Sequence, residues 1–292
     1  MTEHAVRAES GATLAKLLDV DEFPGDCFAG QPQPWPRHRA FGGLLLAQSI
    51  AAAGRTMPER ASVHSVHAVF VNRADPERQT EYAVRRVRDG LASGLRQVSA
   101  RQGDREVCAV TVAGQRRRDS SQYTSARPIT VPPEDLPTLG ERFATAGAEV
   151  PGSRVLPETV DLRHVEPPPY LAPPRSPVPP RQLAWLRITE PLPDDPLVAV
   201  CALVYSADLL IGEPVFFLPD CARDPAAADL VSLDHALWLH GGFDAGEWLL
   251  YDQECLAATD GRVLNRASVY RRSGALVATM AQEGLLRVRG RR

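Results

Sequence analysis

The sequence lacks the features that mark several common classes of protein. It has no run of about 18 apolar residues, so a membrane-spanning helix is not expected. The amino-terminal residues include acids and form no continuous apolar stretch, which argues against a secretory signal and favours a cytoplasmic location. The 5 cysteines are odd in number and include no Cys-x-x-Cys pair, which disfavours both a disulfide framework and a structural zinc site.

Motifs for cofactor chemistry are also missing. The chain has neither a Gly-x-Gly-x-x-Gly nor a P-loop motif, so we expect no cofactor. It has no Gly-x-Ser-x-Gly elbow, which disfavours a Ser–His–Asp hydrolase. His64 and His67 lie three residues apart in a strand-like run, where they point to opposite faces and cannot chelate one metal ion. The net charge of −3, with both signs mixed, argues against nucleic acid as a partner.

The composition is that of a folded protein with a substantial core, at 44% hydrophobic and 24% charged residues. The length of 292 residues allows two domains, or one large domain built from two similar parts. Between residues 116 and 181 lie 14 of the 26 prolines. Proline has no backbone donor, so this stretch is predicted to be an extended linker over the surface.

The same pattern of elements occurs on both sides of the linker. A buried, nearly all-apolar helix is predicted from residue 41 to 53, followed by strands over 64–72, 81–88, 95–101 and 106–115. After the linker come a strand at 183–189, an apolar helix at 197–210, and strands over 232–240, 248–257, 263–271 and 276–282. A shift of about 170 residues superposes the two sets of four strands, which favours an internal duplication.

A buried helix wrapped by a long antiparallel sheet, present twice, predicts an α+β double hotdog fold. Pairing two such copies side by side protects sheet edges that one copy would leave open. We expect an amino-terminal repeat at residues 12–115, the linker at 116–181, and a carboxy-terminal repeat at 182–289 that carries the catalytic residues. Two unrelated α+β domains are the alternative.

Asp208 is the first candidate for chemistry. It lies on the same stripe as apolar residues of the second helix, near the end where the helix dipole disfavours negative charge. A carboxylate in that place needs a partner or a function. If the helix instead ends near Tyr205, Asp208 is simply solvated.

Gln282 and Ser232 are weaker candidates on their own. Gln282 shares one face of the last strand with three apolar residues, and its amide could hold a water or a carbonyl. It could equally end the strand in solvent. Ser232 opens a strand, where serine is usually a turn residue.

Together these residues resemble the acyl-CoA thioesterase II family, the TesB-like enzymes. The resemblance covers most of the chain outside the linker and rests on these motifs: Phe41-Gly42-Gly43 with Gln48, Val63-His64-Ser65-Val66-His67, Arg88-Asp89-Gly90, Ser206-Ala207-Asp208, Ser232-Leu233-Asp234-His235, Glu247-Trp248-Leu249-Leu250-Tyr251, and Ala281-Gln282-Glu283-Gly284.

The resemblance implies hydrolysis of acyl-CoA to free acid and CoA. Asp208, Ser232 and Gln282 would position and activate a water that attacks the thioester carbonyl. Substrate would also contact residues of the first half, namely Phe41, Gly42, Gly43, Gln48 and His64. The backbone amides around the two glycines could polarise the carbonyl, because a helix amino-terminus favours an oxyanion.

Two first-half segments, 70–76 and 91–94, depart from the family pattern and leave substrate choice open. The alternatives are a hotdog enzyme that hydrolyses or hydrates carrier-protein or polyketide thioesters, and a non-catalytic acyl-thioester-binding protein. We expect a homo-oligomer, either dimer or tetramer. Acyl chain length, the residues that bind the CoA phosphates and the in vivo substrate are not predicted.

Overall fold

The computed structural model describes residues 13–33, 40–118, 121, 123–148, 157–168, 170–171, 179–222 and 228–288. Residues 12 and 289, the predicted outer ends of the two repeats, lie outside these ranges.

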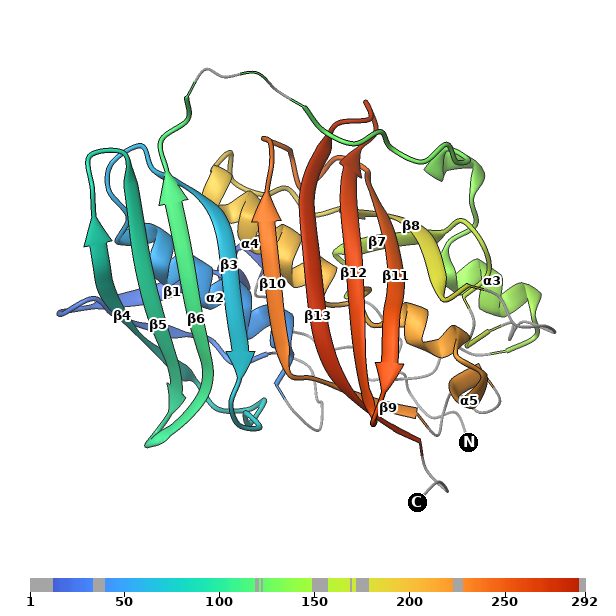
Figure 1. Ribbon diagram of the computed structural model, residues 1–292, viewed down its shortest axis with the longest axis horizontal. Helices are drawn as coiled ribbons and strands as arrows, with labels where there is room; N and C mark the ends of the chain where they lie inside the picture. Colours follow the sequence, from blue (N-terminus) through green and yellow to red (C-terminus); the bar gives the residue numbers. More distant parts are fainter. Residues whose placement is uncertain are drawn as a thin grey trace.

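The described strands form one 13-stranded sheet (Figure 1). The first half contributes, in spatial order, β1 (Val20–Phe23), β2 (Cys27–Gly30), β4 (Thr80–Asp89), β5 (Ser93–Gln102), β6 (Arg105–Gln115) and β3 (Ser62–Phe70). The second half continues with β10 (Asp234–Leu239), β13 (Leu276–Val288), β12 (Arg262–Arg271), β11 (Leu249–Thr259), β8 (Arg181–Ile188) and β7 (Val160–His164), while β9 (Ala228–Ser232) pairs with β13.

The strand order has two-fold symmetry about the β3–β10 pair. Counted outward from that pair, β6 matches β13, β5 matches β12, β4 matches β11, β2 matches β8 and β1 matches β7. Val66 pairs with Leu237 and Ala68 with His235, and all four side chains are buried, so a shift of 169 residues exchanges the two strands and preserves both their register and their buried face. The predicted duplication and the double hotdog fold are confirmed.

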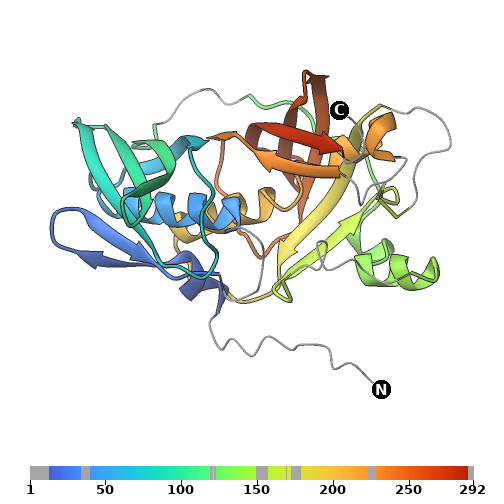
Figure 2. The ribbon, with the colours of Figure 1, turned by 90° about the horizontal axis from the view of Figure 1, so that it is seen from below.

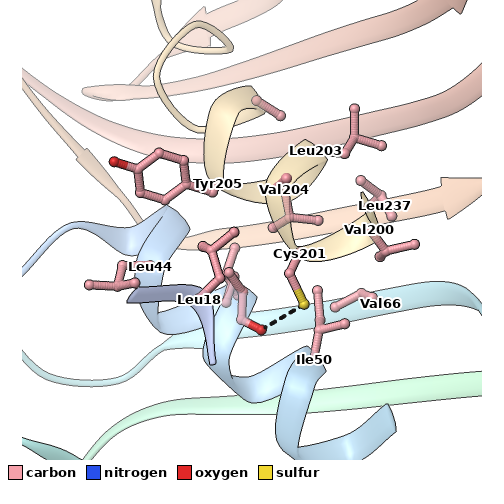
Figure 3. Close-up of a cluster of buried hydrophobic side chains, with 14 of the residues drawn as sticks. Leu18, Leu44, Ile50, Val66, Val200, Cys201, Leu203, Val204, Tyr205 and Leu237 are labelled. Atoms are coloured by element: carbon pink, nitrogen blue, oxygen red, sulfur yellow. Dashed lines mark hydrogen bonds between the residues drawn. The ribbon is translucent and has the colours of Figure 1, made fainter. Parts of the chain in front are cut away.

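Two long helices lie inside the curve of the sheet. These are α2 (Gly42–Arg55) and α4 (Pro196–Ala207), and Figure 2 shows them enclosed between the central strands and the outer strands of each half. Both helices are apolar on nearly all sides because each packs against the sheet and against the other. Cys201 on α4 contacts the carbonyl oxygen of Ala47 on α2 at 3.3 Å, inside a cluster of aliphatic side chains (Figure 3).

The other helical elements are short. They are α1 (Leu14–Leu18), η1 (Pro133–Asp135), α3 (Leu139–Thr145), η3 (Glu213–Phe217) and α5 (Pro219–Ala222). Among the described residues, no helix has the length and apolar character needed to cross a membrane.

The first hairpin, β1 and β2, was not predicted. Its strands have four residues each, and three of the four in β1 are exposed, so neither carries a clear apolar period. The turn between them is tight, with Gly25 and Asp26 at positive φ of 84° and 56°. The second helix also ends earlier than predicted, at Ala207, because Asp208 is its C-cap residue.

The proline-rich linker contains more regular structure than predicted. Helix α3 lies within it and begins with a capping box between Thr138 and Glu141. Strand β7 also lies within it and pairs with β8 at the edge of the sheet. Both elements fall in stretches without proline, whereas the expectation rested on the average composition of the segment. The boundaries of the two repeats stay predictions.

Replacement of Ile50 by alanine tests whether the two-helix core carries the stability of the fold. Ile50 has no exposed surface and lies on α2 facing α4. We expect Ile50→Ala to lower the free energy of unfolding by about 2–5 kcal/mol in denaturant titration, because it leaves a cavity. Leu91→Ala is the control, since Leu91 is 95% exposed and should change stability by less than about 0.5 kcal/mol. Equal small effects would contradict this account.

Candidate active site

The carboxylate of Asp208 is buried and held by both halves of the chain. Its side chain is 6% exposed, although the residue follows the last turn of α4. Oδ2 accepts a hydrogen bond from the backbone N–H of Gly43 at 2.7 Å, and Oδ1 accepts one from Nε2 of Gln282 at 2.7 Å. The solvated alternative for Asp208 is therefore wrong.

The contact with Gly43 resolves the electrostatic conflict seen in the sequence. Asp208 lies at the carboxyl end of α4, where the helix dipole opposes a negative charge. The same carboxylate also lies at the amino-terminus of α2, whose unpaired N–H groups attract anions. The direct 2.7 Å bond at α2 gives the carboxylate a favourable place that α4 alone would not provide.

Glycine is required at positions 42 and 43 for this approach. A β-carbon on Gly42 would lie 2.9 Å from Phe70 and 3.0 Å from Oδ2 of Asp208. A β-carbon on Gly43 would lie 2.7 Å from the Phe41 ring and 2.9 Å from Cβ of Asp208. The two glycines thus let a side chain of the second half reach the helix start of the first.

Gln282 is fixed from its other side by His235. Nε2 of Gln282 lies 3.2 Å from Nδ1 of His235, and the two residues are only 2% and 1% exposed. Since the amide nitrogen is a donor, Nδ1 must be the acceptor and the neutral ring carries its proton on Nε2. Burial lowers the pKa of His235, and the nearby Asp208 and Asp234 carboxylates offset only part of that effect.

An irregularity between β9 and β10 brings Ser232 to the same face. Ser232 pairs with Gly284 and Ala236 pairs with Ala281. Between these two pairs, the segment that joins β9 to β10 therefore contains one residue more than the facing part of β13. Ser232 and His235 therefore share a face although they are three residues apart. Ser232 lies two residues along β13 from Gln282, a spacing of about 7 Å. Within the described residues, no hydrogen bond joins Ser232 to Asp208 or Gln282.

Aromatic rings form the walls beside Asp208. Phe41 is the N-cap residue of α2 and packs edge-on against Tyr205 with ring centroids 5.3 Å apart. Phe70, at the end of β3, reaches the position where Gly42 lacks a side chain. Phe70 and His235 also belong to the site, although neither was predicted to do so from the sequence. The irregularity that brings Ser232 to this face, and the pairing of β10 with β13 that brings His235 beside Gln282, leave no signal in the sequence.

The structure does not bring Gln48 and His64 to Asp208. The Gln48 amide donates to the carbonyl oxygens of Leu17 and Gln31 and accepts from Tyr82, so its bonds stay within the first half. His64 lies six residues before Phe70 on β3, which corresponds to about 20 Å along the strand. Their predicted contact with substrate is untested. Neither residue belongs to the group of Gly43, Asp208, His235 and Gln282, which is called the Asp208 cluster below.

The two-fold-related place on the other side of the molecule has no carboxylate. Alignment of the two helices from their first residues relates Gly43 to Leu197 and Asp208 to Gly54. A β-carbon on Gly54 would lie 2.4 Å from the Leu197 side chain, so the same close contact exists there with apolar partners. This asymmetry supports one site per chain.

Both halves of the chain match family models of known enzymes. Residues 31–115 match the acyl-CoA thioesterase N-terminal domain, and residues 133–286 match the acyl-CoA thioesterase C-terminal domain.

Individual relatives cover nearly the whole chain. Acyl-coenzyme A thioesterase 8 of Homo sapiens is 29% identical over 94% of this chain and 89% of its own length. Acyl-CoA thioesterase 2 of Haemophilus influenzae is 26% identical over 94% of this chain and 96% of its own length. The crystal structure of acyl-CoA thioesterase II TesB2 from Mycobacterium marinum has a TM-score of 0.79 at 33% identity, covering 95% of this chain and 99% of that one.

The lowered pKa of His235 predicts how stability depends on pH. The folded chain keeps the imidazole neutral, whereas the unfolded chain binds a proton near pH 6.5. The stabilisation is therefore complete above that pH and is lost as the pH falls, because the unfolded state then binds more protons. We expect the free energy of unfolding to fall between about pH 7.5 and 5, and to fall less in His235→Gln. Desolvation also lowers the pKa of His240, but it does so equally in wild type and in His235→Gln. Identical slopes in the two proteins would therefore contradict the prediction.

Proposed function

The chain belongs to the acyl-CoA thioesterase family, and from this membership we propose that it hydrolyses acyl-CoA by direct attack of a water molecule held at Asp208. The observation that carries the proposal is the carboxylate of Asp208, buried and bonded on one side to Gly43 and on the other to Gln282.

Asp208 has the properties of a general base for this reaction. Each of its oxygens accepts one hydrogen bond and retains capacity for another, so a water can donate to the carboxylate. As the water oxygen bonds to the thioester carbon, one of its protons passes to Asp208. The carbon–sulfur bond then breaks, and the leaving CoA thiolate takes up the proton that Asp208 received, which restores the carboxylate. A positioned base of this kind contributes about 10²–10⁴ to the rate.

Gln282 and Ser232 would hold the same water. Gln282 is kept in one orientation by Asp208 and His235, and Ser232 presents a hydroxyl on the same face of the sheet. We assign Gln282 the larger effect, because it contacts Asp208 directly.

Two of the three backbone amides that could polarise the thioester carbonyl already donate hydrogen bonds within the protein. The N–H of Phe41 donates to Oε1 of Gln33 at 2.7 Å, and the N–H of Gly43 donates to Asp208. The N–H of Gly42 lies between them at the start of α2 and is the donor we assign to the carbonyl oxygen.

The alternatives stay distinguishable by assay. A carrier-protein or polyketide thioesterase, a hydratase and a non-catalytic binder would share the fold. A cytoplasmic location and a dimer or tetramer stay predictions.

Replacement of Asp208 tests the proposed base. We expect Asp208→Asn to lower kcat by about 10²–10⁴ with little change in KM, measured by thiol release across acyl-CoA chain lengths. Asp252→Asn, which removes a carboxylate paired with Arg181 on the far side of the second half, should keep the wild-type rate. Full activity in Asp208→Asn would refute the role of the base. A wild-type rate at the blank level would refute the proposed function, and saturable binding without turnover would then favour a binder.

Gly43→Ala tests the positioning of Asp208 without removing it. The added methyl group would displace either Phe41 or Asp208, and a shift of about 1 Å can cost about 10²-fold in rate. We therefore expect kcat to fall at least about tenfold. Gly140→Ala is the matched control, because a β-carbon there meets no atom within 4 Å, and it should keep wild-type kinetics. Equal kinetics in both variants would show that the close approach is not needed.

A further inference from the structure

A row of buried amides leads away from the Asp208 cluster across the inner face of the sheet. It has one member on each of four neighbouring strands, namely Gln282 on β13, Asn265 on β12, Gln253 on β11 and Gln182 on β8 (Figure 1). All four side chains are buried, with at most 2% exposure.

The register of the strands makes the row continuous. Asn265 lies directly opposite Gln282, and Gln253 lies directly opposite Gln182. Cys255 opposes Asn265, and Gln253 is two residues from Cys255 on the same face. Three strand spacings of about 4.8 Å give the row a length of about 14 Å from Gln282.

Most of these amides have hydrogen-bonding capacity that the protein does not use. Gln253 donates to Gln182 at 3.4 Å, but Oε1 of Gln253, Nε2 of Gln182 and both polar atoms of Asn265 have no partner. Buried polar groups in native proteins are almost always bonded. Among the described residues up to 115, no buried side-chain nitrogen or oxygen lacks a partner. The described part of the first half thus has no such unused capacity.

The two-fold-related half provides an internal comparison. The two-fold relation of β3 to β10 makes Val66 the counterpart of His235, and since Val112 lies opposite Val66 as Gln282 lies beside His235, Val112 is the counterpart of Gln282. Val112 lies opposite Arg96, as Gln282 lies opposite Asn265. Arg96 is fully buried, yet its guanidinium bonds to Asp89 and to the backbone, so it has no unused donor in the way that Asn265 has.

Gln253, the next member of the row, also differs from its counterpart in the first half. In the second half, Gln253 lies opposite Ala267. In the first half, the matching pair is Val84 opposite Val98, both buried. The fold therefore accommodates a valine at the position where the second half has Gln253, so the architecture does not require an amide there.

The place of the row indicates which part of a thioester it would meet. It begins at Gln282, beside the carboxylate proposed to activate water, and continues into the interior. Helix η3, which follows Asp208, lies against β8, β11 and β12, and the four amides are buried beneath the surface. The nucleotide of CoA is large and charged and must stay near solvent, so a fully buried row faces the acyl group.

We propose that the acyl site of this chain selects acyl groups that carry a hydroxyl or oxo oxygen, with Asn265 and Gln253 as the residues that determine this specificity. The proposal rests on the proposed function. Asn265 would bind an acyl oxygen that lies one strand spacing, about 5 Å, from Gln282. Gln253 would bind an acyl oxygen deeper in the site. A site with buried polar groups disfavours a substrate that leaves them unpaired, whereas an extra hydroxyl is only weakly rejected by an apolar site.

Matched pairs of substrates test the proposal. Hexanoyl-CoA and decanoyl-CoA are compared with their 3-hydroxy, 5-hydroxy and 3-oxo analogues by thiol release, in wild type and in the Asn265→Val/Gln253→Val double variant. We expect wild type to prefer at least one oxygenated analogue by about tenfold or more in kcat/KM. The double variant should lose that preference and keep or increase its activity on the alkyl substrates. Ser268→Val, a polar-to-valine change on the outward face of β12, should leave the preference as in wild type.

The outcomes separate the two proposals. A wild type that hydrolyses alkyl substrates as well as every oxygenated analogue overturns the specificity proposal and leaves the thioesterase function intact. Equal changes in both substrate classes in the double variant also overturn it. A wild type inactive on all acyl-CoAs defeats the proposed function instead. The melting temperature of the double variant should equal or exceed that of wild type, so a loss of preference through unfolding would be detected.

Discussion

The contact between the Asp208 carboxylate and the start of α2 is the constraint on which the site depends. It places a negative charge at the carboxyl end of one helix, where it is unfavourable, and stabilises it with the amino-terminus of the other. Neither half of the chain can make this arrangement alone. The two glycines, the aromatic walls and the Gln282–His235 pair all lie around this one carboxylate.

The duplication explains both the shape and the asymmetry of the molecule. The two-fold axis through the β3–β10 pair generates two equivalent helix contacts, one between Gly43 and Asp208 and the other between Leu197 and Gly54. Only the first contact has polar partners. The sheet shows a similar divergence, with Val112 and Val84 buried in the first half at the places of Gln282 and Gln253 in the second. Duplication thus provided two equivalent places, and the present sequence has a buried carboxylate in one of them.

Much of this was predictable from the sequence, and the remainder depends on contacts that no pattern encodes. Strong apolar periodicity predicted both long helices and the eight strands of the two main sets. Asp208 and Gln282 were recognisable as polar residues on otherwise apolar faces. The sequence did not predict the short β1–β2 hairpin or the strand β7 inside the proline-rich segment. His235 enters the site only through the pairing of β10 with β13, Ser232 through an extra residue before β10, and Phe70 through a gap left by Gly42. These are tertiary effects of single residues.

The central claim is that water held at Asp208 attacks the thioester directly. The most direct measurement is a single turnover in ¹⁸O-labelled water with enzyme in excess, followed by mass spectrometry of the free acid and of the chain. Direct attack predicts one labelled oxygen in the acid, no acyl adduct on the quenched chain, and an unlabelled Asp208 peptide. An acyl adduct at Asp208, or label in that peptide with an unlabelled acid, would contradict the account.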